Sequence, residues 1–179
     1  MSNPVERWNS VSKGLHWLFV ILLLSVWGAV ELHEFYERGD PMRGWFMQLH
    51  FSLGVGVLML LALRLYWRAR HKRPQIEGKK WQKALSSLTH GGLYLLILAM
   101  PVSGIVMRQL FGRDTEFFGL FAVPNLFAKN PDLGKQIAFL HKDVMWPALL
   151  VLVGLHIAAA LWHHFIARDN TLTRMLPQR

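Results

Sequence analysis

The sequence predicts an all-α protein, a four-helix bundle that spans a membrane as a single domain over residues 1–179. Two observations predict this fold class. Of the 179 residues, 53% are hydrophobic and only 17% are charged, which is too apolar for an ordinary soluble domain. Four windows also contain no Asp, Glu, Lys or Arg, and each is close to the roughly 20 residues that cross a bilayer core: 14–30, 44–63, 84–107 and 144–166.

These windows define the transmembrane helices in chain order. The first helix, expected at about 14–32, lacks the small-residue cleavage site of a signal peptide, so we expect it to be retained. The others are expected at about 44–67, 84–108 and 137–166. The fourth contains Pro147, which offers a kink or bulge.

The distribution of charge predicts the orientation of the bundle. Thirteen of the 20 Lys and Arg residues lie on the side that holds both termini and the middle loop, whereas eight of the 11 acidic residues lie on the other side. The positive-inside rule therefore places both termini in the cytoplasm, an N-in/C-in topology. The net charge of +9 is explained by this topology and by contact with membrane lipid, so no nucleic-acid partner is expected.

The absence of cysteine narrows the possible cofactors. A chain with 0 Cys cannot form a disulfide, a thiolate metal site, an iron-sulfur cluster or a covalent haem attachment. Any haem would therefore be of the non-covalent b type.

Histidine carries the candidate chemistry. Ionisable groups at membrane depth are costly unless they have partners, so each is a functional candidate. Seven of the nine histidines lie within or at the edge of the expected helices: His16, His50, His90, His141, His156, His163 and His164.

The depths of these histidines form two layers. His50 and His141 fall near the outer ends of the second and fourth helices. His156 follows His141 by 15 residues, a rise of about 22 Å, and shares the inner layer with His16 and His90.

Two imidazoles from different helices at matched depth suit axial ligation of a haem iron. Zinc would require four ligands. The alternative is hydrogen bonding between helices. On an ideal helix the 15 residues from His141 to His156 overshoot four turns by about 60°, which a bulge near Pro147 could absorb.

The motifs "GLHW", "LH", "LTHGGLYLLILAMPVSGIVM" and "GLHIAAALWHHF", the last followed by "RDNTLTRMLP", resemble the bacterial cytochrome b561 family and its superoxide oxidase branch. The resemblance covers nearly the whole chain. It implies a multi-pass protein of the bacterial inner membrane with two b haems. It assigns His16 and His156 to the cytoplasmic-side haem and His50 and His141 to the periplasmic-side haem. It leaves His90 as a non-ligand, either a haem-packing or a hydrogen-bonding residue. We expect 14 residues between the fourth-helix ligands in relatives.

His163 lies seven residues beyond His156, on nearly the same helix face and about 10.5 Å closer to the cytoplasm. From spacing alone it is either an interfacial residue beside Trp162 or a quinone ligand. The resemblance favours the second reading, in which His163 hydrogen-bonds ubiquinone, and leaves His164 facing lipid headgroups.

Four cations of the outer loops could steer a small anion if they converge: Arg38, Arg43, Lys135 and Lys142. The alternative is a set of scattered, solvated charges among eight acidic residues.

The resemblance implies an oxidoreductase that carries electrons from periplasmic superoxide to ubiquinone. Outer-sphere transfer of this kind needs no catalytic acid, base or nucleophile at the outer site. The alternative function is a cytochrome b subunit that links a periplasmic dehydrogenase or hydrogenase to the quinone pool, so a protein partner is possible but not required. The Phe-rich segment 108–136 could cap the outer haem or dock such a partner.

Overall fold

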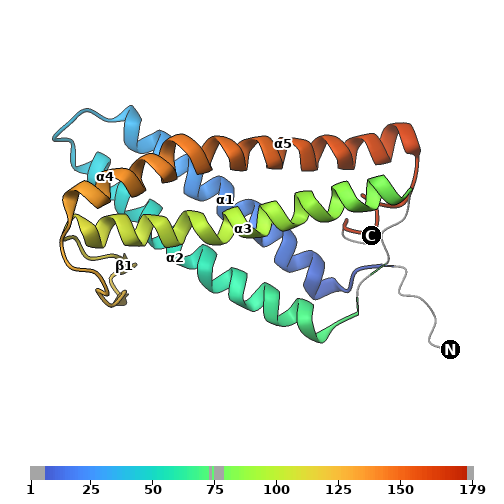
Figure 1. Ribbon diagram of the computed structural model, residues 1–179, viewed down its shortest axis with the longest axis horizontal. Helices are drawn as coiled ribbons and strands as arrows, with labels where there is room; N and C mark the ends of the chain where they lie inside the picture. Colours follow the sequence, from blue (N-terminus) through green and yellow to red (C-terminus); the bar gives the residue numbers. More distant parts are fainter. Residues whose placement is uncertain (1–6, 73, 75–78, 177–179) are drawn as a thin grey trace.

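The computed structural model describes residues 7–72, 74 and 79–176, and Arg73 and Arg179, counted among the cytoplasmic charges above, lie outside that range. Its first three long helices are α1 (Ser10–Phe35), α2 (Pro41–Arg70) and α3 (Lys80–Leu110). The fourth is a continuous rod of four segments: α4 (Pro131–Phe139), η1 (Leu140–Met145), α5 (Trp146–Trp162) and η2 (His163–Ala167). A hairpin of β1 (Glu116–Phe117) and β2 (Phe121–Ala122) precedes it (Figure 1).

The four rods are each long and apolar enough to cross a membrane, which confirms the predicted membrane four-helix bundle. All four extend beyond their charge-free windows, by 13 residues at the start of the fourth rod (131 against 144), and polar residues cap several of the ends. The side chain of Asn9 accepts a hydrogen bond from the Ser12 N–H at 2.8 Å, and that of Asp40 accepts one from the Met42 N–H at 2.8 Å. Large apolar side chains such as Leu88 and Ile166 remain exposed on the outside of the bundle, as a lipid-facing surface requires.

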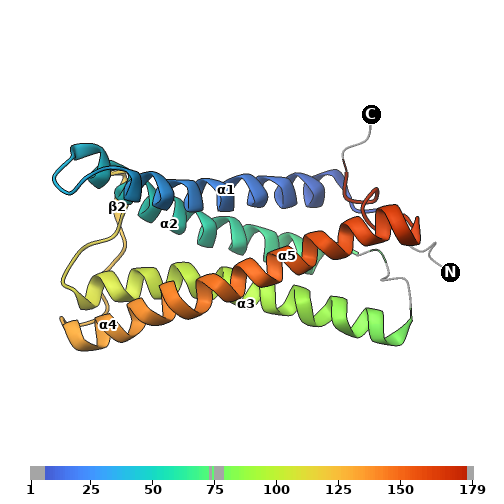
Figure 2. The same cartoon turned by 90° about the horizontal axis from the view of Figure 1, so that it is seen from above.

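The helices are arranged in two layers, α1 with α2 and α3 with the fourth rod (Figure 2). A cluster around Phe19, Val57 and Leu61 packs α1 against α2. Within the described residues, no Cα atom of α1 lies within 8 Å of one in α5. The seam between these two helices is therefore wide, and side chains must bridge it.

The fourth rod changes helical type where His141 lies. Residues Leu140–Met145 form a π-helix, and Pro147 occupies the first turn of α5. A π-helical turn takes about one residue more than an α-helical turn, so η1 absorbs the overshoot expected between His141 and His156. The bulge precedes the proline, whose missing N–H is harmless in the first turn of a helix.

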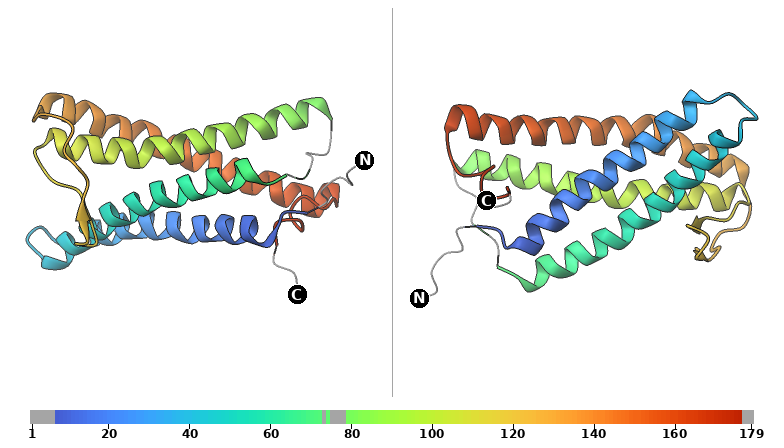
Figure 3. Two further views of the ribbon diagram at one scale, coloured as in Figure 1. Left: turned by 90° about the horizontal axis from the view of Figure 1, so that it is seen from below. Right: turned by 180° about the vertical axis from the view of Figure 1, so that it is seen from behind.

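The hairpin is fastened to the outer half of α2 (Figure 3). Ser52 is only 1% exposed, and its hydroxyl donates to the Glu116 carbonyl at 3.2 Å and accepts from the Phe118 N–H at 3.0 Å. Leu120 and Leu126 remain 77% and 79% exposed. The segment 108–136 therefore covers part of α2 and also presents apolar side chains outward.

Candidate functional site

The outer histidine of α2 is held by the neighbouring helix. His50 Nδ1 lies 3.1 Å from the Val26 carbonyl oxygen of α1. A carbonyl oxygen can only accept, so Nδ1 carries the proton and donates it. The lone pair of Nε2 is then free to bind a metal ion.

The outer histidine of η1 is held in the same way by α3. His141 is 8% exposed, and its Nδ1 lies 2.9 Å from Ser103 Oγ. The Ser103 hydroxyl donates its one proton to the Met100 carbonyl at 2.8 Å, so it accepts from His141 Nδ1–H. The α3 backbone at Gly104 passes close to the ring, since a Cβ there would lie in van der Waals contact with His141 Cε1, at 3.4 Å. His141 therefore also has a free Nε2 lone pair.

The inner histidines of three helices meet in one cluster. The rings of His16 and His156 are 6.2 Å apart between centroids, and those of His90 and His156 are 5.3 Å apart. His90 Nδ1 lies 3.3 Å from Ser86 Oγ on its own helix. The structure thus brings together all three residues expected in the inner layer, with His156 between the other two.

The donor set fits a b haem. Within the described residues, no group of three or more His, Cys, Asp or Glu side chains is placed to hold a metal ion by itself. Instead, His16 and His156 come from opposite helix layers with their rings 6.2 Å apart, and His50 and His141 lie on opposite layers at the other end of the bundle. A haem iron needs only one such nitrogen on each side of the macrocycle.

His163 is paired with an acid that the sequence analysis did not identify. Its Nδ1 lies 2.5 Å from Asp169 Oδ2. The chain reverses through Arg168, whose φ of 52° is left-handed, and this turn brings the carboxylate back to the ring. A signal was present in the sequence, since Asp169 is the first acidic residue after His163.

Asp169 is ionised in this arrangement. Partial burial acts to raise its pKa, but hydrogen bonds from Thr171 and His163 outweigh burial and lower the pKa overall. The Thr171 N–H donates to Asp169 Oδ1 at 2.8 Å. The carboxylate therefore accepts the proton of His163 Nδ1, which leaves Nε2 as the free end of the ring.

The four predicted steering cations have different surroundings. Arg43 Nη1 donates to the Tyr36 carbonyl at 2.6 Å, and its Nη2 lies 3.1 Å from Glu34, so it ties α1 to α2. Lys135 pairs with Asp132 at 3.0 Å. Arg38 and Lys142 are exposed, and Lys142 lies within electrostatic range of His50.

A further cation at the outer end was missed in the sequence. The Arg108 guanidinium lies 3.7 Å from the ring centroid of Phe51, the neighbour of His50, and also donates to the Asp114 carbonyl. Arg108 is the first charged residue after the third apolar window, which is the signal that could have singled it out.

Comparisons with known proteins agree with this architecture. Residues 7–178 match the family model described as prokaryotic cytochrome b561. The chain is 32% identical over 176 residues to a protein of Yersinia pestis named "Probable superoxide oxidase CybB", an alignment that covers 97% of this chain and 98% of the relative.

Two relatives from Escherichia coli strain K12 carry the family name. "Cytochrome b561 homolog 1" is 30% identical over 98% of this chain and 99% of its own length. "Cytochrome b561 homolog 2" is 33% identical over 98% of this chain and 94% of its own length. The chain therefore belongs to the prokaryotic cytochrome b561 family, the multi-pass electron-transfer proteins of the bacterial inner membrane that bind b-type haem.

Proposed function

We propose that the protein is a superoxide:ubiquinone oxidoreductase with two b-type haems. His50 and His141 would hold the outer haem, and His16 and His156 the inner one. The observation that carries this proposal is the separation of the membrane histidines into two groups at opposite ends of the bundle, each drawing on both helix layers. The likeness to a probable superoxide oxidase suggests the electron donor. When bound, the haems supply one-electron transfer between the two faces of the membrane.

The proposed reaction balances across the membrane. Two superoxide anions each give up one electron on the outer side and leave as molecular oxygen. One ubiquinone on the inner side takes up these two electrons and two protons and becomes ubiquinol.

The two outer histidines have fixed ring orientations and would keep oxygen and superoxide from binding the iron. Their Nδ1 hydrogen bonds to Val26 and Ser103 fix the two ring planes before the cofactor enters. His50 and His141 would both hold the iron, so the haem would supply outer-sphere electron transfer at this end and would not bind oxygen or superoxide. No acid or base is required at this end.

Two outer cations would attract a small anion locally. Arg108 at the end of α3 and Lys142 in η1 form no ion pair with a carboxylate among the described residues, whereas Arg43 is paired with Glu34. A positive field raises the encounter rate with superoxide without contributing to the chemistry, and salt weakens it.

His163 serves the quinone in this proposal. Asp169 accepts the Nδ1 proton of His163, so Nε2 is the ring nitrogen that remains to contact the quinone. A ring carrying a proton on Nε2 can donate it to a quinone carbonyl oxygen as negative charge develops there. The Asp169 carboxylate stabilises the positively charged form of the ring.

The alternative function is a cytochrome b subunit for a periplasmic dehydrogenase or hydrogenase. The exposed apolar residues of the outer hairpin segment, Leu120 and Leu126 among them, favour it because they offer a surface to a partner protein.

Rapid mixing of the oxidised, purified protein with superoxide as the sole reductant tests the proposal. We expect fast reduction of the visible haem bands, abolished by superoxide dismutase. If dithionite reduces the haems and superoxide does not, the relay subunit replaces the oxidase as the proposed function.

A further inference from the structure

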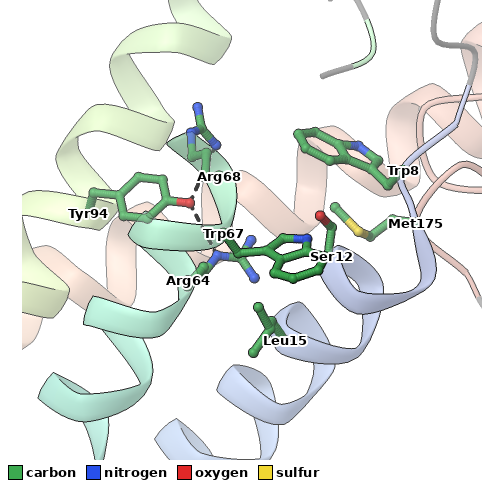
Figure 4. A pocket seen from close by; sticks show the side chains of 8 residues that line it. All are labelled: Trp8, Ser12, Leu15, Arg64, Trp67, Arg68, Tyr94 and Met175. Carbon is green, nitrogen blue, oxygen red and sulfur yellow. Dashed lines mark hydrogen bonds between the residues drawn. The ribbon is translucent and has the colours of Figure 1, made fainter. Parts of the chain in front are cut away.

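Two arginines of α2 converge at the cytoplasmic end of the bundle. They line a pocket between α1, α2, α3 and the C-terminal segment, together with Leu15 and Tyr94 (Figure 4). Arg64 Nε donates to the Tyr94 hydroxyl at 3.1 Å, and Arg68 Nη1 donates to the same oxygen at 3.4 Å. One neutral oxygen thus receives hydrogen bonds from two positive charges.

The Arg64 guanidinium carries a hydrogen-bond donor for which the described residues of this pocket supply no acceptor. Its Nη1 is buried and has no hydrogen-bond partner among the described residues. Within the same part of the chain, neither Arg64 nor Arg68 forms an ion pair with a carboxylate. The side chain of Arg64 is half-buried, and leaving its buried Nη1 donor without a hydrogen-bond acceptor is unfavourable, so an acceptor in the pocket would stabilise it.

The position of Arg64 relates this incomplete pocket to the inner histidines. Arg64 lies within electrostatic range of His16, His90 and His156. Leu15, which lines the pocket, directly precedes His16 in α1. The planar fork of a guanidinium matches the paired oxygens of a carboxylate or phosphate.

We propose that Arg64, with Arg68 beside it, binds an anionic oxygen group, and that this group is a propionate carboxylate of the inner haem. The inference rests on the proposed inner haem and adds its counter-ion. The other source of the same chemistry is the phosphate of a lipid headgroup at the cytoplasmic face.

A redox titration of the purified holoprotein with dithionite tests this, because it needs neither superoxide nor quinone. Removing a positive charge near the iron favours the ferric state. Arg64→Gln should therefore lower the midpoint potential of one haem and leave the other unchanged. At fixed ambient potential the ratio of reduced to oxidised haem should fall about tenfold.

Three variants separate charge from structure. Arg70→Gln removes a charge from an exposed position of the same helix and should leave both potentials unchanged. Tyr94→Phe removes the hydrogen bonds of the pocket but keeps both charges, so it too should have little effect. Arg64→Lys keeps the positive charge, so the midpoint potential should stay close to that of the wild type. A shift in Tyr94→Phe equal to that in Arg64→Gln would overturn the proposal, because the effect would then be structural.

Repeating the titration at pH 6 to 8, in maltoside micelles and in phospholipid nanodiscs, identifies the source of the anion. A propionate freed from Arg64 can take up a proton when the haem is reduced. Arg64→Gln should therefore acquire a pH-dependent potential in both environments. A shift confined to micelles, where no lipid phosphate neutralises Arg64, would assign Arg64 to lipid phosphate and overturn the propionate assignment. Unchanged potentials in both would overturn the anion site itself, whereas a wild-type protein with only one haem would instead refute the proposed function.

Discussion

The outer and inner histidines are held in different ways. His50 and His141 each donate Nδ1–H to a neighbouring helix, at 3.1 and 2.9 Å. His16 and His156 contact each other through their ring edges, and within the described residues neither ring forms a hydrogen bond. The polypeptide therefore fixes tautomer and ring plane at the outer end. At the inner end it supplies only packing and nearby positive charge.

The difference follows from what surrounds each end. The outer end is closed by a π-helix and by a hairpin that the buried Ser52 fastens to α2, and the half-buried Ser103 supports His141 there. The inner end is closed by the first turn of α1 and the C-terminal segment, where Trp17 Nε1 donates to the Met175 carbonyl at 3.1 Å. We expect the outer site to be the more pre-organised and the inner site to depend more on its ligand.

The largest expected effect is loss of one haem. His141→Ala and His156→Ala should each reduce the haem content from the proposed two per chain to one, because each variant removes one of the two ligands proposed to hold a haem. The pyridine haemochrome assay measures this ratio. His90→Ala is the matched control at the inner end and should keep both haems. Retention of two haems in His156→Ala would contradict the ligand assignment.

The second-largest expected effect is the loss of quinone reduction in a protein that keeps both haems. His163→Ala removes the proposed proton donor, and we expect the rate of ubiquinone reduction to fall by about 100-fold or more. Asp169→Asn should give a smaller loss, because the ring remains but is no longer oriented. His71→Ala, in an exposed position after α2, controls for loss of an imidazole. Normal quinone reduction in His163→Ala would leave that residue as an interfacial anchor.

Removing a supporting hydroxyl at each end sharpens the comparison directly. Ser103→Ala takes away the acceptor for His141 Nδ1–H and should weaken retention of the outer haem about tenfold. Ser86→Ala, its counterpart beside His90, should have no measurable effect on the inner haem. Dilution-driven haem loss, followed optically, distinguishes the two. Equal behaviour of both variants would mean that the two ends are held alike.

The smallest expected effect is the pH dependence contributed by Asp169. Its pKa is lowered in the folded protein, so its contribution to stability is present above its ordinary pKa of 3.8 and is lost as the pH falls through the lower folded value. The difference in Tm between wild type and Asp169→Asn should shrink as the pH falls below about 4. A difference that persists undiminished to about pH 2 would contradict the lowered pKa.

Much of the bundle was predictable because the membrane imposes simple requirements on a sequence. Uncharged windows of sufficient length gave the four helices, and the excess of Lys and Arg on one side predicted their orientation. Helix ends were placed less well, because the caps at Asn9 and Asp40 lie outside the apolar windows. The irregularity between His141 and His156 was expected from a residue count, and it takes the form of a π-helix.

The sequence by itself determined the membrane class, the depth of each histidine and the absence of thiolate chemistry, since length, charge and cysteine content act locally. Only the tertiary structure decided which atoms support those histidines. Helix packing places Val26 and Ser103 behind the outer rings, and it places Tyr94 between Arg64 and Arg68. A chain reversal places Asp169 behind His163. Contacts of this kind depend on the azimuth of each helix and on the π-helical register, and neither quantity can be read from hydropathy.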